Sequence, residues 1–258
     1  MQKEYKKFED SCIFEGMTSI RSIIKGIDSG INERRIEKIL YDTSRIHKIA
    51  KELGYLRAVS EKYGFYLEEK TSLEIEEMAL GNSHGGLLAI ATNRQLPVLS
   101  ADTSLPENSF FAMLEGIEDP YNFGYSIRSL YAMGCDGIIL SERNWMSAGG
   151  IVSRSSAGAS EMLPMYISTP LEALRIFQSK GYKVICADEN TDNVLGLCEL
   201  KLPLLLIIGG EKRGISQSVL KESDLLVKIG YGRDFRASLS AASAATMFAY
   251  EISRQNKN

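Results

Sequence analysis

Two glycine-containing loops near the carboxyl end of the chain carry the residues best placed to hold a small ligand. The first loop begins with Gly209 and Gly210 and follows residues 204–208, an apolar run that predicts a strand buried on both faces of a parallel sheet. Glycines directly after a buried strand let backbone groups approach a ligand where a side chain would block them. The second loop, GYGRDFRAS, follows a strand predicted at residues 224–229 and ends at Ser238. A single Gly-Gly pair also suits an ordinary tight turn, but two such loops favour two walls of one pocket.

Helices are predicted after both loops. Ser216 stands where a serine would cap the first helix, and Ser238 stands at the start of the second, LSAASAATMFAYEISRQ. The many alanine and serine side chains of the second helix allow close packing against a glycine-rich loop or against a partner helix.

Strands and helices also alternate upstream of these loops. Strands are predicted at residues 110–114, 137–140, 162–166 and 182–187, and helices at 123–133, 151–157 and 170–179. This alternation is typical of a parallel sheet covered by helices.

The first hundred residues predict a smaller α/β unit. Helices are expected from Thr18, from Ser44 to Gly64 and over residues 73–80, with strands at 35–41, 65–67 and 86–91. Residues 92–109 contain two prolines and no periodicity, so they predict a linker. We therefore expect one domain at residues 1–100 and a second at 110–258, in keeping with a length of 258 residues.

Composition excludes several classes of protein. The formal net charge of -3 gives no global attraction to a polyanion, so any RNA binding must use local basic patches. The four cysteines form no CxxC pair and the two histidines are far apart, so we expect neither a metal site nor a disulfide framework. The polar N-terminus and the lack of a long apolar segment predict a soluble, cytoplasmic protein without a signal peptide. The phosphate-loop, dinucleotide and GxSxG fingerprints are absent.

Three stretches together resemble the motifs of the SpoU/TrmH family of RNA ribose 2'-O-methyltransferases, which belongs to the SPOUT superfamily. They are DPYNFGYSIR at residues 119–128, IIGGEKRGIS at 207–216 and KIGYGRDFRASLSAASAATMFAYE at 228–251. In the second stretch Gly209, Glu211 and Gly214 match the Gly-x-Glu-x-x-Gly pattern of the family. The N-terminal unit, with its NSHGGLLAI segment, is similar to the small RNA-binding domain that many members carry.

The resemblance implies an α/β fold in which a small RNA-binding domain precedes a SPOUT domain with a parallel sheet and a trefoil knot. It further implies a homodimer that acts on structured RNA, either rRNA or tRNA, with S-adenosylmethionine as the cofactor. The alanine-rich C-terminal helix suits the contact between two copies. The cofactor is expected to contact mainly backbone groups of the two loops, at Gly209, Gly210, Gly214, Ile229, Gly232 and Leu239.

The same resemblance suggests how the catalytic residues divide their roles. Because a sulfonium methyl group is already activated, the enzyme must mainly hold the ribose 2'-oxygen in line with it and remove a proton. The family assigns the base to the arginine that matches Arg128, but a guanidinium is not deprotonated in proteins. We expect Arg128 to orient the ribose and a neighbouring phosphate instead. Asn122 and Glu211 would position Arg128, and Ser238 and Ser240 would line the pocket.

The third stretch departs from the family pattern. Gly230 and Tyr231 stand where Pro-Met is usual, the loop is one residue longer, and Ser240 replaces an asparagine. A serine has a shorter reach and offers one donor where a carboxamide offers two. An RNA-binding protein of the same fold with lost or weak catalysis is therefore an alternative, and an α/β enzyme for another small metabolite is a third.

Several basic residues have two open interpretations. Lys212, Arg213, Arg233 and Arg236 lie in the two loops and would either bind RNA phosphates or form ordinary surface charge. Arg34, Arg35 and Lys38 would likewise contact phosphate or form a solvated face. His84, in a glycine turn, is expected to be a structural or surface residue.

Overall fold

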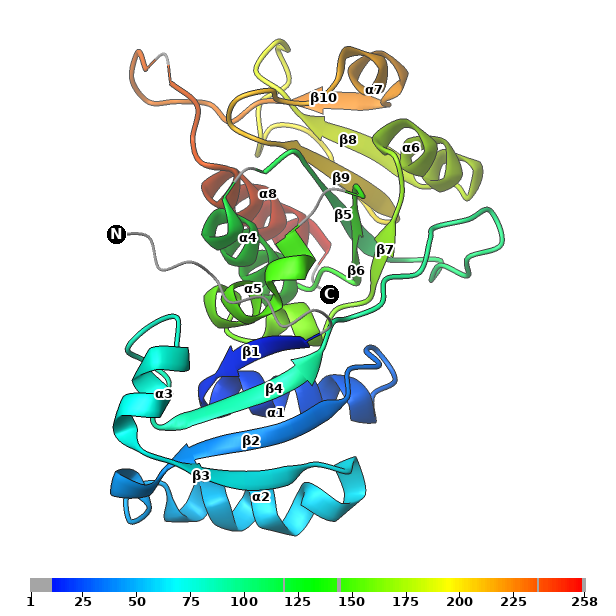
Figure 1. Ribbon diagram of the computed structural model, residues 1–258. Coiled ribbons are helices and arrows are strands. Elements are labelled where there is room, and N and C mark those ends of the chain that lie inside the picture. The colour runs from blue at the N-terminus through cyan, green and yellow to red at the C-terminus, as the bar shows by residue number, and fades with distance from the viewer. Residues whose placement is uncertain (1–10, 118, 143–144, 236, 257–258) are drawn as a thin grey trace. The chain divides into compact units, whose positions relative to one another are not determined.

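The computed structural model describes residues 11–117, 119–142, 145–235 and 237–256 and divides into two compact units (Figure 1). The first unit contains Met1–Gln95 and Trp145–Met162, and the second contains Leu96–Asn144 and Leu163–Asn258. The segment Trp145–Met162 therefore packs with the first unit, although it follows the start of the second in the sequence.

The first unit is built on a four-stranded sheet. Its strands are β1 (Ser11–Glu15), β2 (Ile36–Asp42), β3 (Tyr66–Lys70) and β4 (Leu87–Thr92). Their order is β1-β4-β2-β3, in which β4 runs antiparallel to β1 and β2 while β2 and β3 are parallel. The carboxyl ends of β1, β2 and β3 therefore lie at one edge of the sheet, where β4 begins.

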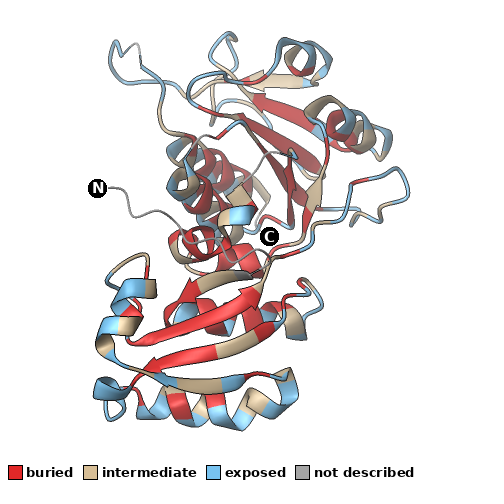
Figure 2. Cartoon of the chain, in the orientation of Figure 1, coloured by how far each residue is buried: buried red, intermediate tan, exposed pale blue. Residues whose placement is uncertain are grey.

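Helices cover both faces of this sheet. α1 (Gly16–Asp28) and α2 (Ala50–Tyr63) share one core with Ile39, and α3 (Ser72–Met78) shares a second core with Leu40. Because Ile39 and Leu40 are consecutive in β2, their side chains point to opposite faces, and the two cores lie on opposite sides of the sheet. Figure 2 shows β2 and β4 largely buried, whereas much of the edge strand β3 is not.

The segment from the middle of the chain adds a further layer to the first unit. It forms η2 (Trp145–Ala148), α5 (Gly149–Ser155) and η3 (Ala159–Glu161). α5 contacts β1 so closely that a Cβ atom at Gly150 would lie 1.9 Å from the carbonyl oxygen of Ile13. Only a glycine fits at this position.

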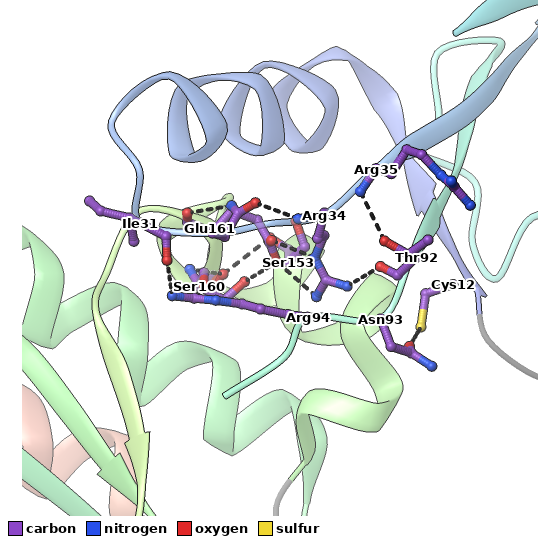
Figure 3. A network of polar contacts seen from close by, with 12 residues as sticks. Cys12, Ile31, Arg34, Arg35, Thr92, Asn93, Arg94, Ser153, Ser160 and Glu161 are labelled. Carbon is purple, nitrogen blue, oxygen red and sulfur yellow. Dashed lines mark hydrogen bonds and ion pairs between the residues drawn. The ribbon is translucent and has the colours of Figure 1, made fainter. Parts of the chain in front are cut away.

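A buried ion pair joins this segment to the residues before β2 (Figure 3). The Arg34 guanidinium donates to the Glu161 carboxylate at 2.7 Å and to the Thr92 carbonyl at 2.6 Å. The side chains of Arg34 and Glu161 are fully buried. The expectation that Arg34 contacts phosphate or faces solvent is therefore wrong, because its charge is already paired inside the protein.

Arg94 makes a second link in the same region. Its guanidinium donates to the carbonyl of Ser160 at 2.6 Å and to that of Ile31 at 2.8 Å (Figure 3). Burial lowers the pKa of Arg94 to about 10, which still leaves the group charged at neutral pH.

The second unit contains a six-stranded sheet in which every pair of neighbours is parallel, as the βα alternation predicts. Its order is β10-β8-β9-β5-β6-β7, so β9 enters between β8 and β5. The strands are β5 (Phe110–Glu115), β6 (Gly137–Leu140), β7 (Met165–Ile167), β8 (Lys183–Ala187), β9 (Leu204–Gly209) and β10 (Leu225–Val227).

Two pairs of helices cover this sheet (Figure 1). α4 (Pro120–Ala132) and α8 (Ala241–Asn256) pack against each other, and α8 also contacts β9. α6 (Pro170–Ser179) and α7 (Gln217–Glu222) form a core on the other face, to which β9 contributes Leu205 and Ile207. Both faces of β9 are buried, which explains its uninterrupted apolar sequence.

Some expected helix starts are wrong. α1 begins at Gly16, so Thr18 lies inside the helix rather than at its cap. α2 begins at Ala50, because Ser44 belongs to the 3-10 turn η1 (Thr43–Arg45), where its amide donates to the Asp42 carboxylate. Ser216 occupies the cap position of α7 but forms no capping hydrogen bond through its side chain.

The start of the last helix also differs from the expectation. α8 begins at Ala241 rather than at Ser238. The Ser240 hydroxyl accepts a hydrogen bond from the Ser243 amide at 3.2 Å, so Ser240 is the residue that caps the helix. β1 was not predicted, because the short segment SCIFE has no clear alternation of polar and apolar residues.

Candidate functional site

Glu211 connects the three motif stretches in the second unit. It follows β9, and its Oε1 accepts hydrogen bonds from the Asn122 side-chain amide at 3.2 Å and from the Ala241 backbone amide at 3.0 Å. Asn122 lies in the first turn of α4, and Ala241 is the first residue of α8. A carboxylate at the N-terminus of α8 is further stabilised by the helix dipole. One side chain thus holds together the ends of β9, α4 and α8.

The N-terminus of α4 is fixed by its own sequence. The Asp119 carboxylate accepts a hydrogen bond from the Asn122 amide at 2.7 Å, and Pro120 occupies the first helical position. The Ser126 hydroxyl donates to the Asn122 carbonyl at 2.8 Å. The side chain of Asn122 therefore projects toward Glu211 from a well-defined helix start.

The Gly209-Gly210 corner is packed against the protein itself. A Cβ atom at Gly209 would lie 2.4 Å from the backbone of Gly214, and one at Gly210 would lie 2.0 Å from the carbonyl oxygen of Gly116. These two glycines are required because the loop folds back on itself and on the end of β5. By contrast, Gly214 is exposed, has a φ of +62° and leaves open space beside its Cα.

Glu115 is a site residue that the sequence analysis missed. It ends β5 in register with Gly209, and its backbone carbonyl accepts from the Gly210 amide at 2.7 Å. Its Oε2 atom is buried without a hydrogen-bond partner among the described residues. Burial raises the pKa of this carboxyl, and a backbone hydrogen bond from Ser216 only partly offsets the effect. Its place at a strand end, directly before Gly116, is only a weak signal, because a single carboxylate at such a position is common.

The second loop is tied to itself and to α8. The Tyr231 hydroxyl accepts a hydrogen bond from the Leu239 amide at 3.3 Å. Ile229 and Leu239 are half-buried, whereas Gly232 and Ser238 are exposed. The loop thus presents backbone groups and small residues at its surface, as a site that contacts a ligand through its backbone requires.

Ser240 has a structural contact in addition to its expected role in lining the pocket. Besides capping α8, its hydroxyl lies 3.0 Å from the hydroxyl of Ser243. An asparagine at this position would also cap the helix, so the change to serine conserves the local structure of α8.

Arg128 lies on the exposed side of α4, in the same helix as Asn122. It forms no hydrogen bond or ion pair with any other residue that the structure describes, so Asn122 and Glu211 contact each other rather than Arg128. The next residue, Ser129, accepts a hydrogen bond from the Thr246 hydroxyl at 2.6 Å, which ties this part of α4 to α8. The Arg128 guanidinium therefore extends from a helix that is bonded to α8, and none of its N–H groups donates to another described residue.

Positive charge is exposed in both loops. Lys212 and Arg213 follow Glu211, and Arg233 lies in the second loop. Arg236, which was grouped with them, lies outside the described residues.

A separate hollow of about 810 Å³ opens in the first unit. It lies where β2 ends and β4 begins, and Arg45, His84 and Arg154 contribute to its lining. Arg154 lies 3.1 Å from the buried Glu15 carboxylate, and Arg45 lies 3.4 Å from that of Asp42. Both arginines remain partly exposed, so each has further N–H donors for a ligand in the hollow.

Contacts with neighbouring backbone fix the lining of this hollow. A Cβ atom at Gly81 would lie 1.9 Å from Nη1 of Arg154, so the guanidinium rests directly on the backbone at Gly81. The Nδ1 atom of His84 accepts from the Gly86 amide at 3.1 Å, and the ring is buried. His84 therefore has a structural role in shaping the turn.

Two other kinds of site receive no support from the described part of the chain. No three of its histidine, cysteine, aspartate and glutamate residues are arranged to hold a metal ion. None of the helices in that part is both long and apolar enough to cross a bilayer. The four cysteines are free thiols.

Comparisons with known proteins agree with this arrangement. A family model described as the SpoU rRNA methylase family matches residues 109–250. The 23S rRNA (guanosine-2'-O-)-methyltransferase RlmB of Shewanella oneidensis is 28% identical over 206 residues, which cover 77% of this chain and 82% of that protein. The putative TrmH family tRNA/rRNA methyltransferase YacO of Bacillus subtilis is 26% identical over 201 residues, which cover 76% and 80%.

Solved structures show the same fold. The AdoMet-bound rRNA methyltransferase from Sinorhizobium meliloti aligns with a TM-score of 0.77 at 21% identity, over 96% of this chain and 89% of that one. The SpoU methyltransferase AviRb from Streptomyces viridochromogenes, in complex with AdoMet, aligns with a TM-score of 0.74 at 22% identity, over 95% and 90%. These similarities confirm the expected α/β fold with its parallel sheet.

Proposed function

The chain belongs to the SpoU rRNA methylase family, and from this premise we propose that it transfers a methyl group from S-adenosylmethionine to a ribose 2'-hydroxyl of rRNA or tRNA. The observation that carries the proposal is the meeting of the three motif stretches at Glu211. Residues far apart in the sequence are brought to one edge of a parallel sheet, where ligands of α/β proteins bind.

The residues at this edge fit S-adenosylmethionine. The open space beside Gly214 leaves its backbone accessible, whereas the Gly209-Gly210 corner is packed, and Glu115 Oε2 adds an acceptor that has no hydrogen-bond partner among the described residues. Backbone of the second loop, from Ile229 to Leu239, completes the proposed set. When bound, the cofactor supplies an activated methyl group, so no residue of the chain needs to form a covalent intermediate.

In the proposed mechanism Arg128 positions the acceptor. Its exposed guanidinium binds the phosphate next to the target ribose and offsets charge as the 2'-hydroxyl passes its proton to solvent. Asn122 and Glu211 act indirectly. Their hydrogen bond ties the start of α4 to the end of β9 and so sets the place from which Arg128 extends.

We propose that the N-terminal domain, residues 1–100, binds structured RNA. Arg45 of this domain lines the hollow at Gly81 together with Arg154 of the segment that packs with it, and both have further donors. They support this role, since phosphate contacts dominate the affinity of proteins for nucleic acids. The SPOUT domain at 110–258, with a trefoil knot in its carboxyl part, carries the catalytic site in this proposal.

A homodimer is part of the proposal. α4 and α8 expose four large side chains, which would be covered by a second copy. These are Tyr121, Tyr125, Met247 and Tyr250. We also place the protein in the cytoplasm, where its proposed RNA substrates are found.

A direct experiment is methyl transfer from radiolabelled S-adenosylmethionine to 23S rRNA and bulk tRNA, followed by mapping of ribose methylation in RNA from cells with and without the gene. Labelled 2'-O-methyl nucleosides that depend on the gene are the expected result. If neither RNA class is labelled although calorimetry shows cofactor binding to the protein, the proposed substrate is wrong.

The serine at position 240 favours one alternative, an RNA-binding protein of this fold with lost or weak catalysis, because a serine offers one donor where a carboxamide offers two. Ser240 is engaged by Ser243 at the position where the family has an asparagine. Under this alternative the protein binds RNA but shows no heat of binding with S-adenosylmethionine. A Ser240→Asn variant that gains methylation would support the alternative, whereas an active native protein rejects it.

A further inference from the structure

The second loop of the site exposes two aromatic side chains that contact each other. Tyr231 is 42% exposed and Phe235 is 56% exposed, and their ring centroids lie 6.0 Å apart with an interplanar angle of 59°. The pair exposes a large apolar surface to water, and such exposed surfaces often mark binding sites.

The pair is held in place next to the proposed cofactor contacts. The Tyr231 hydroxyl accepts from the Leu239 amide at 3.3 Å, and the next residue, Ser240, caps α8. Tyr231 is therefore anchored to the segment that leads into α8, whose first amide, at Ala241, donates to Glu211. Tyr231 also stands at one of the positions where the sequence departs from the family pattern, so the family motif does not account for it.

A cation beside the pair indicates the class of partner. Arg233 lies between the two aromatic residues in the sequence and is exposed. Its guanidinium has no hydrogen bond or ion pair with another residue in the described ranges. Asp234 is the acidic residue of the same loop.

We propose that Tyr231 and Phe235 bind an unpaired base of the RNA substrate by stacking, beside the nucleotide that is methylated. The proposal rests on the proposed function for the identity of the substrate. Proteins recognise single-stranded RNA by stacking its unpaired bases on aromatic side chains, while arginines neutralise the backbone. A protein partner that covered the rings would not need the unpaired Arg233 guanidinium beside them, whereas a polyanion with flat bases uses both the rings and the cation.

The test compares binding of a fluorescein-labelled single-stranded RNA decamer and of its duplex by anisotropy. Phe235→Leu keeps an apolar side chain but removes the ring, and it should weaken binding of the single strand by roughly 5- to 100-fold. Phe235→Trp should restore binding, and duplex binding should be equal in all forms. Leu197→Ala is a matched control. Leu197 is an apolar residue of the same unit that is 85% exposed, and it is not part of the proposed stacking site.

Methyl-transfer kinetics with rRNA or tRNA give a second measurement. Phe235→Leu should raise KM for RNA with little change in kcat, and the Kd for S-adenosylmethionine should stay the same. A weaker cofactor Kd with unchanged RNA binding would instead assign the rings to the cofactor site. A loss of dimer in sedimentation with unchanged RNA binding would assign them to a second copy. Either outcome overturns the proposal.

The anisotropy experiment separates this proposal from the proposed function. If the native protein methylates no RNA but Phe235→Leu still weakens single-strand binding, the stacking site is supported and the enzymatic function is rejected. If the native protein methylates RNA and Phe235→Leu binds the single strand like the native form, the stacking site alone is rejected. If the native protein binds no RNA, both fall.

Discussion

The Asn122 side-chain amide donates a hydrogen bond to the Glu211 carboxylate at 3.2 Å, across 89 positions of sequence. The same carboxylate oxygen accepts from the first amide of α8, at Ala241. The end of the central strand β9 is therefore bonded to the first turns of both helices that cover one face of the sheet. In the proposed mechanism this contact sets the place from which Arg128 extends.

The Asn122–Glu211 contact should be energetically coupled. Asn122→Ala and Glu211→Ala should each lower kcat for methyl transfer, because each removes the hydrogen bond that ties the start of α4 to the end of β9. The double variant should lose less transition-state stabilisation than the sum of the two single losses. The effects of substituting two residues that share a hydrogen bond are not additive. The measurement is a double-mutant cycle on kcat/KM. Strictly additive losses would show that the contact has no part in positioning Arg128.

The Arg34–Glu161 pair should dominate the stability of the first unit. Arg34→Met leaves the fully buried Glu161 carboxylate without its partner, which should lower the free energy of unfolding by about 3–5 kcal/mol. The Arg34→Met/Glu161→Leu double variant should recover most of this loss, because no buried charge remains. Urea unfolding can be followed through Trp145, the single tryptophan of the chain, which lies in the first unit.

Arg175→Met provides the control for this experiment. Arg175 is paired with Glu222 at 2.8 Å on an exposed surface, so its loss should leave stability close to that of the native protein. Equal unfolding curves for Arg34→Met and Arg175→Met would contradict the importance of the buried pair.

Glu115 should make stability depend on pH. Burial raises its pKa in the folded protein above the unfolded value, so the folded state favours the protonated form. Its favourable contribution is full below the unfolded pKa and is lost as pH rises through the folded pKa. Glu115→Gln should therefore match the native protein at about pH 4 and be more stable at pH 8. Thermal unfolding at the two pH values measures the difference, and a less stable variant at pH 8 would refute the assignment.

The strand ends of the second unit could be predicted from the sequence because buried parallel strands have a distinctive composition. Residues 204–208 are apolar throughout and end in two glycines, and the structure buries every one of the five. The motif stretches then identified the loops that the structure brings together. Their meeting point, Glu211, could be expected only as a motif residue, since hydrogen bonds across 89 positions leave no local pattern.

Other features depend on tertiary contacts that no local pattern encodes. Arg34 looked like a surface residue because its neighbours are charged, yet its partner lies 127 positions away at Glu161. The packing of α5 against β1 likewise requires Gly150 and Ile13 to meet, and a glycine in a short helix does not indicate its partner. Glu115 was overlooked because a single carboxylate at a strand end is common, and its environment is evident only in the fold.

The most direct test of the account is to replace Arg128 by alanine and to measure methyl transfer and cofactor binding on the same preparation. Arg128 is exposed and forms no hydrogen bond or ion pair with another described residue, so the variant should fold normally. The account predicts that methylation of rRNA or tRNA is lost while calorimetry gives an unchanged Kd for S-adenosylmethionine. Full methylation by Arg128→Ala would contradict the central claim that this guanidinium positions the ribose acceptor.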